Sequence, residues 1–474
     1  MLDQISPTQT GKLSMISLGC AKNEVDSEEM LGILQAKGFT VNSVHSPSDV
    51  ARSTDVVVIN TCAFIESARE ESVNTIIEAV ERKKRGEIGR VIVTGCLAQR
   101  YPDELANELP EVDAFLGTGQ IGSIGDVVDR SIIRTSQIQE INVKPHHQWV
   151  TNPNRVRLGY PWSAYLKISE GCDHACTFCS IPSFRGKHIS KPIETIVEEA
   201  ELLASQGVKE INLIAQDSTQ YGYDLYGKMR LPELLQALSK VDKLHWIRLF
   251  YCYPSRVDRG IIEAIADTPK VCHYIDMPLQ HADDAMLRRM RRPMTGKAYL
   301  DLIHKFREIV PDVAIRTTFI VGFPGETKEE FANLESFVDE AQFDRLGVFT
   351  YSVEEGTPSA EMKPRITSRV KNARRDSLLE RQQAISKARN QMWIGREMEV
   401  LIESRHPNSP TTAVGRSFRD GPEVDGQVYI QDCMALPGTF VNALIIDASS
   451  YDLVAVSLDA DRLPQTNHSI FKTF

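Results

Sequence analysis

The run from Gly171 to Cys179 places three cysteines at the spacing C-x3-C-x2-C: Cys172, Cys176 and Cys179. This spacing suits three irons of a cubic 4Fe–4S cluster and leaves the fourth iron without a protein ligand. An open iron can bind a small molecule, so such a cluster can act as a reagent as well as an electron carrier. A zinc site or a ferredoxin loop is the alternative, but it would need a fourth cysteine nearby, and none follows.

Length and composition indicate a soluble protein of several domains. The 474 residues are too many for one ordinary core, so two to four domains are expected. The sequence contains no apolar stretch long enough for a membrane span, and Met1 to Lys12 lacks the apolar core of a signal peptide. We therefore expect a cytoplasmic protein whose nine cysteines are metal ligands and buried thiols rather than disulfides. The net charge of −10 argues against a broad nucleic-acid-binding surface.

Residues 12–145 alternate apolar runs with helical segments, which predicts an open parallel α/β domain. The predicted elements are strands at 13–18, 56–59 and 91–93 and helices at 26–37 and 66–84. Each of these strands ends in one or two small residues followed by a cysteine: Cys20, Cys62 and Cys96.

Parallel strands present their carboxyl ends on one edge of a sheet, where ligands bind. The three strand-end cysteines are therefore expected to converge on a second cluster with an open iron. The alternative is that they are small core residues, because free cysteine is often buried. Three further cysteines share no pattern and are predicted to be buried thiols: Cys252, Cys272 and Cys433.

A polar linker at 145–161 is predicted to lead into a central domain at 158–392. Six β/α units there suggest a partial, open, TIM-like (β/α)6 barrel rather than the closed form with eight units. The predicted strands are 164–169, 210–215, 246–251, 273–277, 314–321 and 345–351. The three-cysteine run follows the first of them, at the catalytic end of such a barrel.

A charged helix at 368–392 precedes five short predicted strands, which indicate a small antiparallel β-barrel over 393–463. From Trp393 to Phe474 there are 6 basic and 11 acidic residues, a net charge of −5. A barrel that grips tRNA should be basic, whereas an acidic barrel suits a basic protein partner better.

Other motifs give weaker signals. The turn Gly322-Phe323-Pro324-Gly325 joins a strand to a helix, and glycine lets a backbone approach a ligand closely. We predict that it binds a cofactor, with a plain turn as the alternative. His281 is interpreted as a polar lining residue rather than a ligand, and the basic run from Arg288 to Arg292 is typical of a solvated helix face that could also steer an acidic partner.

The chain resembles the methylthiotransferases, a family of radical S-adenosylmethionine enzymes, over nearly its whole length. The resemblance implies an N-terminal methylthiotransferase domain, a radical domain and a C-terminal TRAM barrel. It implies two 4Fe–4S clusters, one on the radical-domain cysteines and an auxiliary one on the N-terminal cysteines: Cys172, Cys176 and Cys179, and Cys20, Cys62 and Cys96. It also implies that the turn from Gly322 to Glu326 lies near bound S-adenosylmethionine.

Two branches of this family differ in substrate. The RimO branch modifies the β-carbon of an aspartate in the small-subunit ribosomal protein uS12, and the MiaB branch modifies an isopentenylated adenosine of tRNA. Four runs resemble the RimO branch: Ser17–Asn23, Val25–Glu28, Ile181–Gly186 and Gln216–Gly222. Ala21 departs from the proline common there. Together with the acidic barrel, these runs favour uS12 as the partner. Direct binding of tRNA is the less favoured hypothesis. An iron–sulfur scaffold without enzymatic activity is the distant alternative.

The resemblance also implies the chemistry. An aspartate β-carbon is not acidic enough for a side-chain base, so a cofactor must carry the reaction. One electron cleaves S-adenosylmethionine, the resulting 5′-deoxyadenosyl radical removes a hydrogen from the substrate, and the auxiliary cluster supplies sulfur that a second S-adenosylmethionine has methylated. An electron donor and a sulfur donor are required, and the sequence identifies neither. No catalytic side chain is predicted.

Overall fold

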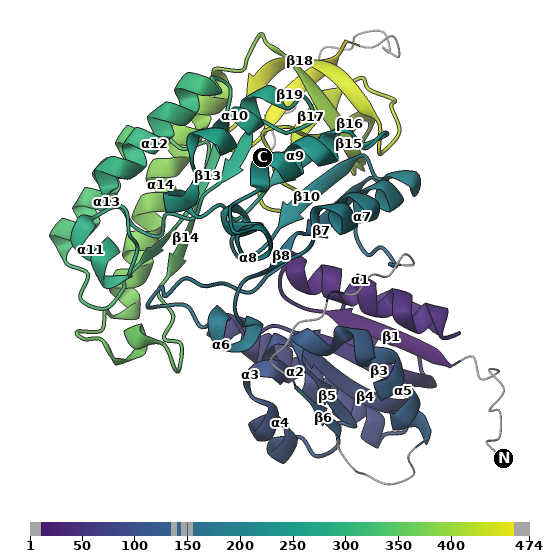
Figure 1. Cartoon of the computed structure of the whole chain (residues 1–474). Helices are drawn as coiled ribbons and strands as arrows, with labels where there is room; N and C mark the ends of the chain where they lie inside the picture. The colour runs from purple at the N-terminus through teal and green to yellow at the C-terminus, as the bar shows by residue number, and fades with distance from the viewer. Residues whose placement is uncertain (1–10, 134–139, 144–148, 150–154, 459–474) are drawn as a thin grey trace.

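The computed structural model describes residues 11–133, 140–143, 149 and 155–458. Figure 1 shows an N-terminal α/β unit, a central unit of strands and helices, and a C-terminal β-barrel, so the predicted fold class is confirmed. Most of the predicted linker, Pro145 included, lies outside the described residues. Within the described ranges, no helix combines the length and apolar character that a membrane crossing requires.

The N-terminal unit is a parallel sheet with the strand order β2-β1-β3-β4-β5-β6. Its strands are β1 (Lys12–Ser17), β2 (Thr40–Val44), β3 (Thr54–Thr61), β4 (Ile88–Gly95), β5 (Ala114–Leu116) and β6 (Glu140–Asn142). The apolar runs predicted β1, β3 and β4. They missed β2, which is a largely exposed edge strand, and β5 and β6, which have three residues each.

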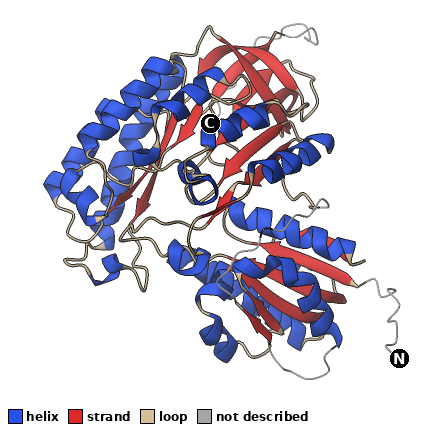
Figure 2. Cartoon of the chain, viewed as in Figure 1, coloured by secondary structure: helices blue, strands red, loops and turns tan. Residues whose placement is uncertain are grey.

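Helices cover both faces of this sheet (Figure 2). They are α1 (Ala21–Ala36), α2 (Glu66–Lys84), α3 (Cys96–Arg100), α4 (Pro102–Glu108) and α5 (Ile124–Ile133), with short 3-10 turns η1 (Pro47–Asp49) and η2 (Thr118–Ser123). On one face Met30 and Leu34 of α1 pack with Val127 of α5. On the other face Ile76 of α2 packs with Leu105 of α4.

The central unit contains the six predicted strands, so the open barrel is confirmed. They are β7 (Ser163–Lys167), β10 (Glu210–Ile214), β11 (Trp246–Leu249), β12 (Tyr274–Asp276), β13 (Ala314–Val321) and β14 (Arg345–Thr350), with the short pair β8 (Ser169–Glu170) and β9 (Ile189–Ser190). The long strands form two parallel sheets, β11-β10-β7 and β12-β13-β14. A bridge between Ile247 and Val271 lies at the junction of the two sheets.

Helices connect these strands, and most of them lie on the outer side of the sheets, while one short helix lies beside the N-terminal unit (Figure 1). They are α6 (Ile181–Arg185), α7 (Ile193–Ser205), α8 (Tyr223–Tyr226), α9 (Leu231–Ser239), α10 (Arg259–Asp267), α11 (Asp284–Arg289), α12 (Gly296–Ile309), α13 (Lys328–Ala341) and α14 (Ser368–Gln391), with η3 (Ser218–Gln220), η4 (Pro254–Arg256) and η5 (Pro358–Glu361). Apolar side chains from the helices and strands form one large core, in which Leu213, Phe306 and Phe337 are buried.

The C-terminal unit is a closed barrel with the strand order β15-β16-β17-β19-β18. The strands are β15 (Glu397–His406), β16 (Ser409–Ser417), β17 (Val428–Gln431), β18 (Phe440–Ala448) and β19 (Leu453–Ser457). Neighbours are antiparallel except for β17 and β19, which run parallel. The predicted small antiparallel barrel is confirmed, with this one parallel pair as the exception.

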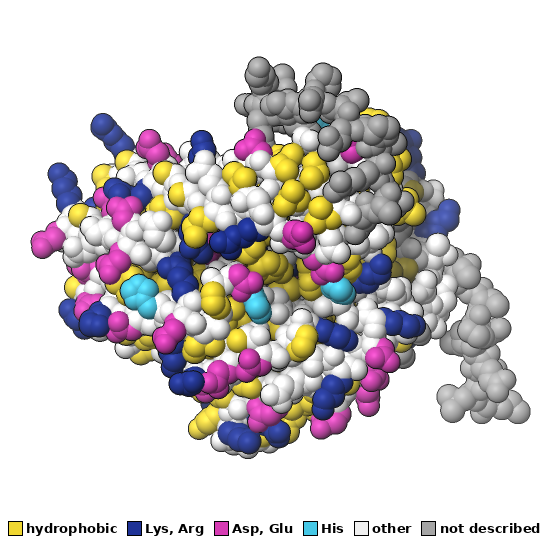
Figure 3. All heavy atoms as spheres, turned by 90° about the horizontal axis from the view of Figure 1, so that it is seen from above, with side chains coloured by type: hydrophobic (Ala, Val, Ile, Leu, Met, Phe, Trp, Pro, Cys, Tyr) yellow, Lys and Arg dark blue, Asp and Glu magenta, His cyan; other side chains and the backbone are white. Residues whose placement is uncertain are grey.

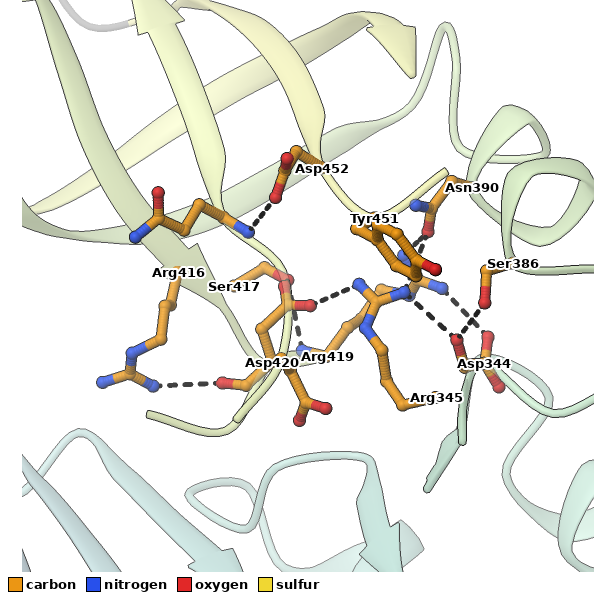
Figure 4. A network of polar contacts seen from close by, with 12 residues as sticks. Asp344, Arg345, Ser386, Asn390, Arg416, Ser417, Arg419, Asp420, Tyr451 and Asp452 are labelled. Carbon is orange, nitrogen blue, oxygen red and sulfur yellow. Dashed lines mark hydrogen bonds and ion pairs between the residues drawn. The ribbon is translucent and has the colours of Figure 1, made fainter. Parts of the chain in front are cut away.

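Buried ion pairs fasten this barrel to the starts of the central strands (Figure 4). Arg345 of β14 donates to Asp420 at 2.5 Å, and Arg419 donates to Asp344 at 2.9 Å. Nearby, Arg416 of β16 donates to Glu210 of β10 at 2.6 Å. The barrel therefore covers the amino ends of the central strands and leaves their carboxyl ends to the functional site.

Candidate functional site

The structure brings the three N-terminal cysteines to one edge of the first sheet. Cys20, Cys62 and Cys96 directly or closely follow β1, β3 and β4, which are adjacent parallel strands. A Cβ atom on Gly19 would lie only 3.1 Å from the Sγ of Cys62. Burial raises the pKa of the Cys96 thiol to about 12, and the charges of Cys20 and Cys62 add to that rise. The three thiols thus lie at the carboxyl ends of three neighbouring strands.

Asn23, in the first turn of α1, joins these strand ends. Its Nδ2 donates to the carbonyl oxygens of Leu18 and Thr61, both at 2.9 Å. Its Oδ1 lies 3.7 Å from the Sγ of Cys96. Sequence reasoning missed this role, because Asn23 stood out only as the end of a motif.

The second cysteine group lies on the loop between β8 and α6. The backbone N–H of Cys172 donates to the carbonyl of Gly186 at 3.0 Å, and that of Cys179 donates to the carbonyl of Cys176 at 3.2 Å. Burial raises the pKa of both Cys172 and Cys179 to about 12, with a further rise from the neighbouring cysteines. The two backbone bonds hold Cys172 against Gly186 and close a turn between Cys176 and Cys179.

A histidine–aspartate pair stands beside this loop. His174 Nε2 lies 2.7 Å from Asp217 Oδ2, and the imidazole stacks on the Tyr253 ring at 3.5 Å. Burial alone would raise the pKa of Asp217, but hydrogen bonds from His174 and Thr219 outweigh it and lower that pKa. His174 and Tyr253 line an open pocket of about 430 Å³.

Arg292 corrects the interpretation of the basic run. Arg288 and Arg291 are exposed as predicted, but Arg292 is buried. Its Nη1 lies 3.7 Å from the Sγ of Cys176, and its guanidinium lies 3.9 Å from the centre of the Tyr253 ring. Its position at the end of a run of charges gave no sign of this contact.

The glycine turn, residues 322–325, packs against the cysteine loop. Phe323 is fully buried in a small cluster with Tyr351, against which Phe178 of the cysteine loop packs. The N–H of Gly322 donates to the carboxylate of Glu326. A Cβ on Gly322 would meet Cγ of Lys371 at 2.3 Å, so any larger residue there would have to displace this side chain of helix α14. The predicted cofactor contact of Gly322, Phe323, Pro324 and Gly325 stays a prediction.

His281 and the three cysteines outside the two groups all lie in the interior. His281 is fully buried with Nε2 3.1 Å from Glu326, so it lies in the interior and does not line an open site; that it is no ligand stays a prediction. The remaining cysteines are buried and unbridged, as predicted: Cys252, Cys272 and Cys433.

A groove of about 770 Å³ runs along the boundary between the N-terminal and central units. Leu97, which follows Cys96, and Tyr101 contribute apolar surface, and a loop at 353–365 forms the opposite wall. Close by, the carboxylate of Glu354 accepts hydrogen bonds from the guanidinium groups of Arg69 and Arg100, the latter at 3.2 Å. Four exposed carboxylates lie along the groove: Glu104, Glu108, Glu355 and Glu361.

The thiol groups suit a group larger than one metal ion. In the described parts of the chain, no set of three His, Cys, Asp or Glu side chains is arranged around a single ion. A structural zinc ion needs four ligands at 2.0–2.3 Å or so, whereas the thiolates of a cube bind different irons and stand farther apart. Two groups of three unbridged thiols are therefore consistent with cubic clusters; Cys62 and Cys96 are buried, Cys20 is exposed, and Cys172, Cys176 and Cys179 are half-buried.

Family models cover each of the three units. The radical SAM superfamily matches residues 166–338, the uncharacterized protein family UPF0004 matches 12–117, and the TRAM domain matches 394–457. Among solved structures, the radical S-adenosylmethionine methyltransferase TsrM of Kitasatospora setae aligns with a TM-score of 0.52 at 14% identity, over 74% of this chain and 77% of that one. The radical enzyme OxsB gives 0.52 at 11% identity, over 80% of this chain and 56% of that one. These likenesses show a radical SAM fold.

Relatives define the chain more closely. A ribosomal protein uS12 methylthiotransferase RimO of Anaeromyxobacter sp. (strain K) is 46% identical over 454 residues, 94% of this chain and 92% of the relative. One of Geobacter sulfurreducens is 45% identical, over 94% of this chain and 98% of the relative. The chain is a radical SAM methylthiotransferase with a C-terminal TRAM barrel. It belongs to the RimO family. Membership of the radical SAM superfamily implies a 4Fe–4S cluster and S-adenosylmethionine as cofactors.

Proposed function

We propose that this chain inserts a methylthio group at the β-carbon of an aspartate in ribosomal protein uS12. The observation that carries the proposal is the set of relatives bearing that name at 42–46% identity over more than nine-tenths of the chain. The motifs of the sequence and the two groups of three thiols support the same reading. A ribosomal substrate would place the reaction in the cytoplasm.

The cluster that activates S-adenosylmethionine is assigned to the loop of the central unit. Cys172, Cys176 and Cys179 would bind it at the carboxyl ends of the barrel strands, where barrel enzymes place their chemistry. The cluster and S-adenosylmethionine, when bound, supply the hydrogen abstraction that no side-chain base can perform at an unactivated carbon. The chain's own residues hold and shield this site: Phe178 packs on buried Phe323, and His174 is held by Asp217.

The second 4Fe–4S cluster is assigned to Cys20, Cys62 and Cys96, as the sulfur source. Its support is the convergence of these thiols at the edge of the first sheet that faces the central unit. Ion pairs of Arg69 and Arg100 with Glu354 join the N-terminal unit to the central unit next to this edge. The glycine turn at Gly322 to Gly325 would support bound S-adenosylmethionine through the cysteine loop.

The substrate is expected to dock by charge. Ribosomal proteins bind RNA phosphates and are basic. Asp420 and Asp425 of the C-terminal barrel face arginines of the central unit, and Glu403 faces Arg416 of the barrel itself. Arg416 and Arg419 are buried in the same ion pairs, so the exposed surface of the barrel keeps an acidic excess. Figure 3 shows acidic and basic side chains interspersed on the face seen from above. That face lacks the broad basic field that would favour tRNA.

The domain limits are proposed as 12–145, 158–392 and 393–463. An electron donor and a sulfur donor complete the reaction and are identified only by their chemical class.

The deciding experiment is anaerobic reconstitution followed by mass spectrometry. We expect about eight irons per chain, as two cubes require. With reductant, S-adenosylmethionine and purified uS12, the substrate peptide should gain one methylthio group on aspartate. A modified tRNA together with an unmodified uS12 would overturn the assignment in favour of a tRNA enzyme. Absence of 5′-deoxyadenosine would indicate a scaffold without activity.

A further inference from the structure

Arg185 reaches from the central unit into the N-terminal cysteine site. It is the last residue of α6, on the segment that follows Cys179. Its Nε and Nη2 lie 3.3 and 3.2 Å from the Sγ of Cys96, so two N–H groups point at one sulfur. The sequence placed Arg185 inside a family motif but gave it no role.

The guanidinium has no freedom to turn away. Its Nη1 donates to Glu170 at 2.9 Å and to Asp26 at 3.1 Å, and its Nη2 also donates to Asn23 at 2.5 Å. Together with the two contacts to Cys96, these bonds occupy the five donors that a guanidinium carries. The side chain is 3% exposed, and Lys167 neutralises the same two carboxylates. These contacts hold the guanidinium of Arg185 in one orientation.

The segment around Arg185 touches both cysteine groups. The carbonyl of Gly186 accepts from the N–H of Cys172 at 3.0 Å, one residue after the contact of Arg185 with Cys96. Phe184 is buried in the core of the N-terminal unit, although α6 belongs to the central unit. The hydroxyl of Thr118 donates to the carbonyl of Phe184 at 3.2 Å. Helix α6 and the residue after it thus contact both the N-terminal cysteine site and the cysteine loop of the central unit.

We propose that Arg185 is a positioning residue of the auxiliary site: it orients the Cys96 sulfur and sets the reduction potential of the cluster bound there. This inference rests on the proposed function, because it takes Cys20, Cys62 and Cys96 as cluster ligands. Hydrogen bonds to ligand sulfurs are a principal means by which proteins tune such clusters. They stabilise the reduced, more negative state, so losing them shifts the potential to more negative values.

A purely structural salt bridge is the competing role for Arg185. It would lower stability when broken and leave the potential of the cluster unchanged. The two roles are separated by a chain that carries only the auxiliary cluster, with Cys172→Ala, Cys176→Ala and Cys179→Ala.

In that background, Arg185→Lys keeps a positive charge between Asp26 and Glu170 but lacks the planar pair of donors. We expect iron to stay at about four per chain and the potential, from redox titration followed by electron paramagnetic resonance, to become more negative. Arg292→Lys is the matched control, because its sulfur partner Cys176 is already absent. It should not shift the potential.

A second measurement needs no substitution at Arg185. The triple-alanine chain, grown with arginine carrying ¹⁵N in its guanidinium, should show a weak ¹⁵N coupling in the pulsed spectrum of the reduced cluster. This measurement decides the question even if Arg185→Lys does not fold. An unshifted potential without ¹⁵N coupling would overturn the role of Arg185 and leave the proposed function standing. A triple-alanine chain that binds no iron would overturn the role of Arg185 together with the assignment of a second cluster to Cys20, Cys62 and Cys96.

Discussion

Each thiol group has a distinct task in the proposed reaction, so single cysteines should separate the two half-reactions. Cys176 belongs to the loop of the central unit, and Cys62 follows β3 of the N-terminal sheet. Replacing Cys176 with alanine should abolish cleavage of S-adenosylmethionine, measured as 5′-deoxyadenosine by liquid chromatography. Replacing Cys62 with alanine should preserve cleavage and stop methylthiolation of uS12. Cys433→Ala, at a buried thiol of the C-terminal barrel, serves as the control and should preserve both steps.

Normal methylthiolation by the Cys62→Ala chain would rule out the auxiliary role of the N-terminal thiols.

Gly95 shows how closely the backbone is packed behind Cys96. Its φ of +93° is unfavourable for other residues, and a Cβ there would lie 2.6 Å from the carbonyl oxygen of Thr61. Gly95→Ala should therefore cost about 2–4 kcal/mol of unfolding free energy, since strain and overpacking add. Thermal denaturation of the apoprotein measures this loss, and reconstituted iron should fall toward one cube.

Gly86→Ala isolates the conformational part of that loss. Gly86 also has a positive φ, of +73°, but nothing lies within 4 Å of the position of its Cβ. We expect a smaller cost, about 1 kcal/mol, and full iron content. Equal losses at the two positions would contradict the close approach described at Gly95.

Helix α4 brings charge to the groove beside the auxiliary thiols. Glu104 and Glu108 lie one turn apart on it and are both exposed. If a basic segment of uS12 passes along this groove, Glu104→Lys with Glu108→Lys should raise KM for uS12 by about five- to tenfold, the effect of roughly 1 kcal/mol of lost attraction. Formation of 5′-deoxyadenosine without uS12 should not change.

Two exposed glutamates elsewhere provide a charge-matched comparison. Glu308→Lys with Glu340→Lys alters net charge equally, on helices α12 and α13. The KM of this chain should stay close to that of the parent. If both double variants raise KM alike, the attraction is a general effect of net charge and the groove has no special part in it.

The three units are held together by charges that are buried between them. Glu210 sits at the start of β10 between Arg416 of the C-terminal barrel and Arg248 of β11. Burial alone would raise its pKa, but the two guanidinium groups outweigh this and lower the pKa from 4.5 to about 2. A carboxylate with a lowered pKa stabilises the fold at pH values above the unfolded pKa, and its contribution is lost as the pH falls through the folded one.

Glu210→Gln should accordingly destabilise the chain by about 3–5 kcal/mol at pH 7, because it leaves buried arginines without their partner. Urea denaturation of apoprotein should show that the difference in unfolding free energy between parent and variant narrows from pH 5 toward pH 3. Glu263→Gln, which removes a surface partner of Arg259, is the control and should change the midpoint little. A gap that is independent of pH would contradict the lowered pKa of Glu210.

Local signals predicted much of this architecture. Apolar runs located β1, β3, β4 and the central strands, and the residues after the strands located the cysteines. The same signals missed β5 and β6, which are too short for a periodic pattern, and Arg292, whose neighbours in the run are exposed. Asn23 and Arg185 were visible only as letters in motifs, because their partners lie on other elements.

The residue order alone was sufficient for the type of each main element and for the two sets of three thiols, since periodicity and cysteine spacing are properties of neighbouring residues. The pairing of Arg185 with Cys96 and of Arg416 with Glu210 was decided by the fold. These contacts join residues that are 89 and 206 positions apart in the chain. Their energy depends on burial and on the orientation of the partner, and neither exists until the units have packed together.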